Sequence, residues 1–141
     1  MGKKRGIAKM KKIDLRSDTM TLPCEGMKER MLSAPLGDDV WGEDPTVNSF
    51  QEQLAELFGK ESALLMPTAT QSNLAAIISH CDRGEEYIVG NEAHCYRWEA
   101  GGAAVLGSVQ PQPIPFEEDG TLHIKKIEEH IKGDDPHFAI T

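Results

Sequence analysis

The chain has 141 residues, a formal net charge of −8 and a hydrophobic content of 39%. This length suits one domain of ordinary size, and the apolar content excludes disorder throughout the chain. Apolar runs such as residues 103–106 are far too short to cross a bilayer, so we predict no membrane partner. With no secretory leader and no paired cysteine motif, we expect a reducing, cytoplasmic setting.

Positive charge is concentrated at the start of the chain. Residues 1–12 hold six of the 15 basic residues and none of the 23 acidic residues. We interpret this stretch as a basic N-terminal tail, followed by a domain over residues 13–141. The acidic character of that domain argues against a nucleic-acid partner. The three cysteines are widely spaced and the acidic loop at 38–44 lacks a calcium pattern, so we expect no metal.

Apolar periodicity, capping residues and helix-ending glycines predict four helices. A polar extended arm at 13–21 precedes the first of them, and a loop at 35–45, rich in Gly, Pro and acidic residues, precedes the second. The predicted helices span residues 25–33, 46–58, 71–81 and 124–131, and Thr46 is the expected N-cap of the second.

Short apolar runs predict strands between the later helices. They lie at 62–66, 86–89 and 103–106, with an edge strand at 109–114 and the start of a further strand at 137–140. Strands that alternate with helices indicate an α/β fold with a mainly parallel sheet. Parallel sheets are covered on both faces and have about five strands on average, so we expect part of a larger sheet.

Two segments carry candidate chemistry. The first runs from the strand at 62–66 into the helix at 71–81, and its helix N-terminus suits an anion such as phosphate. There Thr70 either donates its hydroxyl to the anion or only caps the helix. The second is His94, which follows the strand at 86–89, where open α/β sheets bind ligands. Its imidazole either stacks on a planar ring and moves a proton, or is an ordinary surface side chain.

Five motifs follow one another along the chain. They are IDLRSDT at 13–19, PLGDDVWGEDPTVN at 35–48, PTATQSNL at 67–74, CDRGEEYIVG at 81–90 and EAGGAAVLG at 99–107. In this order they resemble the N-terminal part of the threonine aldolase family. The resemblance implies a partial PLP-dependent transferase-like large domain of fold type I, where PLP is pyridoxal 5′-phosphate. It also implies a small amino-acid substrate, cleavage of threonine or allo-threonine to glycine and acetaldehyde, and a homotetramer with active sites at dimer interfaces.

The resemblance assigns cofactor contacts to individual residues. Ala69 and Thr70 match the family's phosphate-binding Gly-Thr pair, and Gln71 is the next matching residue. Ala69 replaces the usual glycine, and its methyl group is able to crowd the phosphate or to oppose a positive φ. His94 matches the histidine that stacks on the pyridine ring and to which proton transfer is assigned.

Substrate contacts follow from the same resemblance. Ser17 matches a serine that helps to hold the substrate carboxylate, and His137 matches a second catalytic histidine, near the substrate hydroxyl. The sequence departs from the family pattern at Trp41, where a tyrosine is common, and at Ile140, where an arginine is common.

The family's PLP-binding lysine has no match in these 141 residues. Neither do the aspartate that pairs with the pyridine nitrogen and the arginines that bind the substrate carboxylate. Four lysines in helix or turn contexts do not match the family lysine (Lys60, Lys125, Lys126 and Lys132). We therefore expect a truncated, catalytically inactive form of a threonine aldolase-like lyase. The alternative is a non-catalytic remnant that associates with a full-length homologue.

Overall fold

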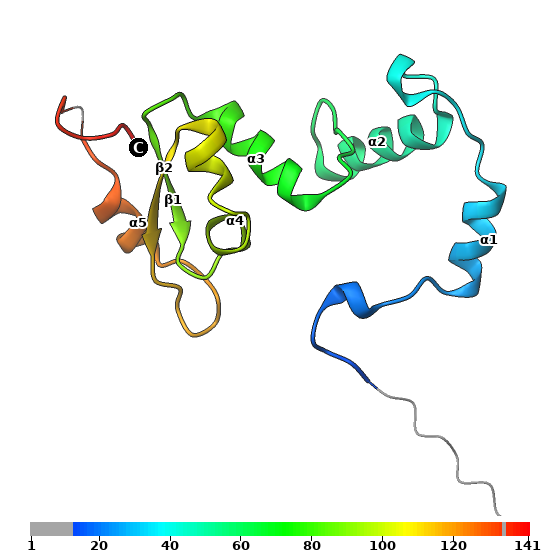
Figure 1. The fold of residues 1–141 in the computed structure, drawn as a ribbon, viewed down its shortest axis with the longest axis horizontal. Coiled ribbons are helices and arrows are strands. Elements are labelled where there is room, and N and C mark those ends of the chain that lie inside the picture. The colour runs from blue at the N-terminus through cyan, green and yellow to red at the C-terminus, as the bar shows by residue number, and fades with distance from the viewer. Residues whose placement is uncertain (1–12, 134) are drawn as a thin grey trace, which may run out of the picture. The chain divides into compact units, whose positions relative to one another are not determined.

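The computed structural model describes residues 13–133 and 135–141. The chain divides into two compact units, and the boundary lies between Ala63 and Leu64. The predicted basic tail at 1–12 lies outside the described residues. Figure 1 labels the helices and strands of both units.

The first unit is helical. The prediction of a helix over residues 25–33 is confirmed with the same bounds. The predicted arm at 13–21 and the loop at 35–45 each include a short 3-10 turn. The elements of this unit are η1 (Asp18–Met20), α1 (Glu25–Ser33), η2 (Asp39–Trp41) and α2 (Pro45–Phe58).

Asp44, rather than the predicted Thr46, caps the N-terminus of α2. Its Oδ1 accepts hydrogen bonds from the N–H groups of Thr46 and Val47, both at 2.9 Å. Its Oδ2 accepts the Gly37 N–H at 3.0 Å, which closes the acidic loop onto the helix. These backbone hydrogen bonds, with that from Val47 the largest contribution, hold the pKa of Asp44 below its ordinary value. Pro45 takes the first helical position, where no intrahelical N–H is needed.

The second unit contains the sheet. Its first helix begins two residues earlier than predicted, and its last helix ends one residue earlier. In Figure 1, α5 lies on one side of the two strands, and α3 and α4 lie on the other. The elements are α3 (Ala69–His80), β1 (Glu86–Gly90), α4 (His94–Arg97), the π-helical η3 (Ala103–Gly107), β2 (Gln110–Ile114) and α5 (Ile124–His130).

Three of the predicted strands are wrong, those at 62–66, 103–106 and 137–140. Residues 103–106 belong to a π-helical turn, because a four-residue apolar run fits either a helix or a strand. Gly102, directly before the turn, is helical, and Ser108, directly after it, is left-handed at φ 56°. Residues 62–66 span the boundary between the units and form no strand, and Leu64 there is 73% exposed. An apolar run becomes a strand only beside a neighbouring strand, and none is described next to this one.

β1 and β2 form a parallel pair, which confirms an α/β unit with a parallel sheet. The Gln110 N–H donates to the Glu85 carbonyl at 2.8 Å, so the even-numbered residues of β2 face β1. Pro111 and Pro113 therefore face the other edge, where a missing N–H breaks no ladder. The prediction of an edge strand at 109–114 is confirmed, and its prolines protect that edge from further pairing.

The opposite edge of β1 meets the last residues of the chain. The Glu86 N–H donates to the Ile140 carbonyl at 2.8 Å. This N–H and the Glu85 carbonyl belong to one peptide group and point in opposite directions, so Ile140 and β2 lie on opposite edges of β1. Residues 137–140 form no strand, so the predicted strand start there is wrong. The described residues show a single backbone hydrogen bond between this segment and β1.

Packing is closest around the strands of the second unit. Its buried apolar side chains are Val89, Ala103, Val109 and Ile114. The Phe116 ring lies so close to Gly90 that a Cβ atom there would be 2.0 Å from the ring. Many large apolar side chains elsewhere remain exposed, including Phe50 at 45% in α2 and Ile78 at 50% in α3. The apolar stripes of these helices are thus only partly covered.

Candidate functional site

The first turn of α3 carries the predicted phosphate-binding residues. Thr68 caps this helix, since its hydroxyl oxygen accepts the Gln71 N–H at 3.2 Å. Thr70 is therefore not the cap, and the donation of its hydroxyl to an anion stays a prediction. Within the described residues, the N–H groups of Ala69 and Thr70 have no hydrogen-bond partner. Because all these residues are exposed, the first turn offers open donors to an anion.

Ala69 fits the backbone without strain. In the described residues, the left-handed conformation occurs outside glycine only at Ala100 and Ser108, and Ala69 lies within α3. The glycine usual at this position is thus not required by a positive φ. Any cost of the alanine comes from the approach of its methyl group to a bound anion.

His94 begins α4, just beyond the carboxyl end of β1, which ends at Gly90. Its side chain is 62% exposed, and its Nδ1 lies 2.8 Å from Oε1 of Glu99. The Glu99 side chain is only 4% exposed. An exposed imidazole held from behind by a buried carboxylate has one nitrogen anchored and its faces open to a planar ring.

Asn73 connects this imidazole to the phosphate-binding segment. Its Nδ2 donates to the same Oε1 of Glu99 at 2.7 Å. Asn73 lies three and four residues after Thr70 and Ala69, and therefore on the same face of α3. The open first turn of α3 and His94 are thus joined through two hydrogen bonds within one unit.

Sequence reasoning missed the roles of Asn73 and Glu99. Both lie in motifs that carry the family resemblance, but the contact between them joins residues 26 positions apart. A local pattern does not reveal such a pairing. One local signal for Glu99 is present in the sequence: it is an acidic residue directly after the aromatic loop that follows His94.

Burial and negative charge affect the two other titratable groups beside Glu99. Burial raises the pKa of the Cys95 thiol, and the Glu99 carboxylate adds to this. Burial also raises the pKa of the Tyr87 phenol, with smaller contributions from Cys95 and Glu99. Both groups therefore stay protonated at neutral pH, and the thiol is not an activated nucleophile.

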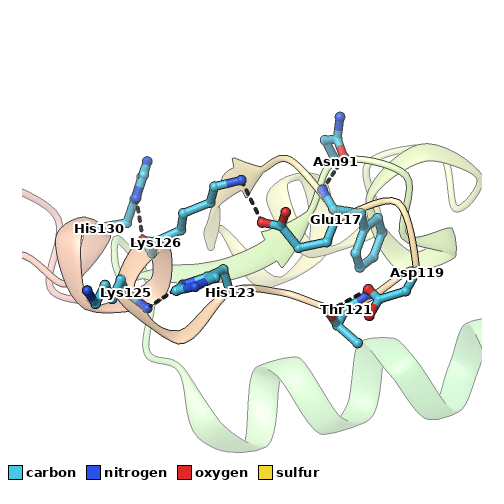
Figure 2. Close-up of polar contacts among 9 residues, drawn as sticks. Asn91, Glu117, Asp119, Thr121, His123, Lys125, Lys126 and His130 are labelled. Atoms are coloured by element: carbon cyan, nitrogen blue, oxygen red, sulfur yellow. Dashed lines mark hydrogen bonds and ion pairs between the residues drawn. The ribbon is translucent and has the colours of Figure 1, made fainter.

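The turn between β2 and α5 is fixed against the end of β1, as Figure 2 shows. The Asn91 Oδ1 accepts the Phe116 N–H at 3.2 Å. Lys126 forms an ion pair with Glu117 at 2.7 Å, and His123 caps α5 by accepting the Lys125 N–H. This network is satisfied internally, so we assign it to the support of the loop rather than to chemistry.

Ser17 belongs to the first unit, where its side chain is used locally. Its hydroxyl oxygen accepts the Thr19 N–H at 3.3 Å and the Thr19 hydroxyl at 2.9 Å. Its own O–H donates to Asp18 at 3.2 Å. The hydroxyl thus caps the η1 turn, and its role toward a substrate stays a prediction.

His137 belongs to the second unit, but the structure does not bring it beside His94. It lies three residues before Ile140, which bonds to the amino end of β1 at Glu86, whereas His94 follows the carboxyl end. The length of β1 alone, about 13 Å, separates these ends. The exposed His137 ring instead contacts Asp135, with Nδ1 2.7 Å from Oδ1. Its catalytic role stays a prediction.

Two kinds of feature are absent from residues 13–133 and 135–141. No three His, Cys, Asp or Glu side chains gather closely enough to hold a metal ion. No helix in the same residues has the length and apolar character that a membrane span needs.

Residues 14–141 match the beta-eliminating lyase family. The chain therefore belongs to this family, whose members are PLP enzymes of fold type I, and its α/β unit with a small parallel sheet is part of that fold.

Individual relatives of the chain carry more specific names than the family does. Over 129 residues the chain is 63% identical to the low specificity L-threonine aldolase of Escherichia coli (strain K12), covering 92% of this chain and 39% of that protein. It is 44% identical over 124 residues to low-specificity L-threonine aldolase 1 of Arabidopsis thaliana, with 87% and 35% covered. A more distant relative, at 35% identity over 132 residues, is alanine racemase TOXG of Cochliobolus carbonum, with 91% and 33% covered. The chain thus spans less than two-fifths of the length of these curated relatives.

The described residues fit the cofactor of this family. PLP combines a phosphate with a planar aromatic ring. The open N–H groups at the start of α3 suit the phosphate, and the exposed His94 ring suits the aromatic plane. Both belong to the second unit and are joined through Asn73 and Glu99.

Proposed function

We propose that the second unit binds the phosphate and pyridine ring of PLP as part of a threonine aldolase-type lyase. The observation that supports this most is the connection from α3 through Asn73 and Glu99 to His94. Two hydrogen bonds join the helix that begins with open N–H groups to the exposed His94 ring, within one unit. A helix N-terminus alone, or an exposed histidine alone, would not carry the proposal.

Each cofactor-binding residue has a distinct task in this proposal. The N–H groups of Ala69 and Thr70, with the Thr70 hydroxyl, hold the phosphate, and Gln71 lines the same turn. His94 stacks on the pyridine ring and moves a proton at its Nε2 atom. Bound PLP would supply the electron sink that stabilises negative charge on the amino acid. The protein contributes orientation and proton transfer.

The proposed substrate is a small β-hydroxy-α-amino acid, threonine or allo-threonine, which is split into glycine and acetaldehyde. Support comes from the relatives in Escherichia coli and Arabidopsis thaliana, which are named L-threonine aldolases. On the family pattern, Ser17 holds the substrate carboxylate and His137 lies near the β-hydroxyl. We further propose a homotetramer that acts in the cytoplasm.

The 141-residue polypeptide by itself is proposed to be inactive. Lys126 is paired with Glu117 at 2.7 Å, and Lys132 is paired with the buried carboxylate of Glu86. An ammonium group held in an ion pair is a poor nucleophile toward the PLP aldehyde, because only a neutral amine attacks. These lysines are therefore poor substitutes for the family's PLP-binding lysine.

A second candidate function is that of a non-catalytic partner of a full-length homologue. The observation in its favour is a groove of about 1080 Å³ in the first unit, between α1 and α2. Apolar side chains from both helices line it, among them Met27, Met31 and Phe50. Co-expression with the Escherichia coli relative would then yield a mixed oligomer that survives size-exclusion chromatography. Separate elution of the two chains would remove this candidate.

A chimera tests the principal proposal. Residues 13–141 replace the aligned stretch of the Escherichia coli relative, and glycine and acetaldehyde release from threonine is measured alongside alanine racemisation. We expect PLP-dependent release, lost in His94→Ala and kept in the control His80→Ala at the far end of α3. A folded, assembled chimera that racemises alanine without cleaving threonine would contradict the proposal. So would one that does not retain PLP.

A further inference from the structure

Glu99 is buried and contacts His94, the exposed side chain to which the proposed function assigns ring stacking and proton transfer. Its side chain is 4% exposed, whereas that of His94 is 62% exposed. The contact between Oε1 and Nδ1, at 2.8 Å, is short enough for a charge-assisted hydrogen bond. A carboxylate placed behind an imidazole in this way controls which ring nitrogen carries the proton.

Asn73 makes the direction of that hydrogen bond definite. Its amide donates to the same Oε1 that contacts His94. An ionised carboxylate only accepts hydrogen bonds, so with two groups converging on one oxygen, both must donate. The Nδ1 of His94 therefore carries hydrogen. In the neutral ring, Nε2 is then left with its lone pair.

The local backbone leaves the contact with Glu99 as the main restraint on the His94 ring. α4 is only four residues long, and its N-cap residue, Ala93, makes no side-chain hydrogen bond to the helix. The helix thus does little to fix the His94 ring. Directly after Glu99, Ala100 adopts the left-handed conformation at φ 53°, which costs energy for a residue with a Cβ. The residue with the unfavourable backbone conformation is therefore the one that directly follows Glu99.

We propose that Glu99 is a positioning residue that holds neutral His94 as its Nδ1–H tautomer, with Nε2 as the proton acceptor, and that Asn73 fixes the Glu99 carboxylate. The importance of this for catalysis rests on the proposed function, but the tautomer itself does not. Free neutral histidine favours the opposite tautomer, with hydrogen on Nε2. The carboxylate therefore reverses the intrinsic preference and presents a base at the exposed side of the ring.

Nitrogen-15 NMR of the 141-residue protein, labelled at histidine, tests the inference directly. For the neutral His94 ring we expect a pyrrole-type shift at Nδ1 and a pyridine-type shift at Nε2. Glu99→Met removes the acceptor at similar size, and the two shifts should exchange. Glu99→Gln keeps an acceptor without the charge and should lie between. Glu92→Gln, an exposed neighbour paired with Arg97, is the control and should leave the shifts unchanged.

Kinetics of the chimera give a second measurement. Glu99→Gln should lower kcat by about 10- to 100-fold, the usual effect of losing the partner that orients a functional histidine, with little change in KM. Asn73→Ala should have a smaller effect in the same direction. A wild-type His94 with hydrogen on Nε2, or unchanged shifts in folded Glu99→Met, would overturn the inference. Correct shifts in a protein that does not bind PLP would instead overturn the proposed function.

Discussion

The second unit buries two glutamates near opposite ends of β1, and their partners differ. Glu86, at the amino end, is fully buried and shares its oxygens with Lys132, Thr141 and Gln110. Glu99, beyond the carboxyl end, offers one oxygen to a neutral amide and to an imidazole. A permanent cation neutralises the first carboxylate, whereas the second is paired with a ring that is able to change its charge.

This difference separates a structural carboxylate, Glu86, from Glu99, for which we propose a functional role. Burial opposes ionisation of Glu86, but the hydrogen bonds from Lys132 and Thr141 and the positive charge of Lys132 outweigh it, so its pKa lies below the ordinary value. A carboxylate saturated in this way stabilises the edge of the sheet. A buried carboxylate whose partner is an exposed imidazole affects the protonation of that ring, which a ligand at the surface is able to contact.

Removing the cation from Glu86 should have the largest effect on stability. Lys132→Met leaves a buried carboxylate without its cation, with only neutral donors from Thr141 and Gln110. We expect the free energy of unfolding to fall by about 3 kcal/mol, the low end for a buried pair because Lys132 is partly exposed. Glu99→Met removes the charge together with its acceptor and should cost only about 1 kcal/mol. Urea unfolding of both variants measures the contrast. Equal losses would show that the two carboxylates do not differ as described.

Closing the space beside Gly90 should disturb the carboxyl end of β1. In Gly90→Ala the new methyl group would meet the Phe116 ring, which must move. We expect a loss of about 2 kcal/mol, typical of an overpacked site, together with a displaced loop before His94. Thermal unfolding gives the stability and the His94 ring NMR signals report the loop. Gly133→Ala, with open space around it, is the control. A neutral Gly90→Ala would mean that the ring has room to move.

Acid should weaken the Glu86 end of the sheet. A carboxyl group whose pKa is lower in the folded chain than in the unfolded chain stabilises the fold above its unfolded pKa. That contribution disappears as the pH falls from the ordinary value of about 4.5 through the lower folded value. Glu86→Gln should therefore lose stability at neutral pH but show a flatter profile below pH 4.5. A variant whose profile parallels that of the wild type would place the acid sensitivity elsewhere.

The smallest expected effect concerns Ala69. Replacing it by glycine removes the methyl group that, on our proposal, lies next to the PLP phosphate at the start of α3, so we expect binding of that phosphate to strengthen by about two- to threefold. The gain is limited because glycine weakens the helix. Titration with PLP checks this, and Ala76→Gly, further along the same exposed helix, controls for the helix effect. Unchanged or weaker affinity would show that the methyl group is harmless.

Local sequence patterns predicted the helices of the first unit. The spacing of apolar residues predicted α1 with its exact bounds, although no side chain caps its start. For α2, Gly59 predicted the end, where it adopts the left-handed conformation at φ 60°. The strand prediction for residues 103–106 is wrong because four apolar residues fit a helix or a strand equally, so that packing decides between the two. Glu99 was missed for a related reason, since its role depends on a partner 26 residues away.

Binding of a PLP analogue tests the central claim most directly. Pyridoxine 5′-phosphate lacks the aldehyde, so it does not react with surface lysines and reports only the phosphate and ring sites. Titrated into the 141-residue chain, it should bind saturably, compete with inorganic phosphate and shift the ring signals of His94. Thr70→Val should weaken binding several-fold, whereas Ser79→Ala at the other end of α3 should not. The absence of saturable binding to the folded chain, or binding that leaves His94 unchanged, would contradict the account.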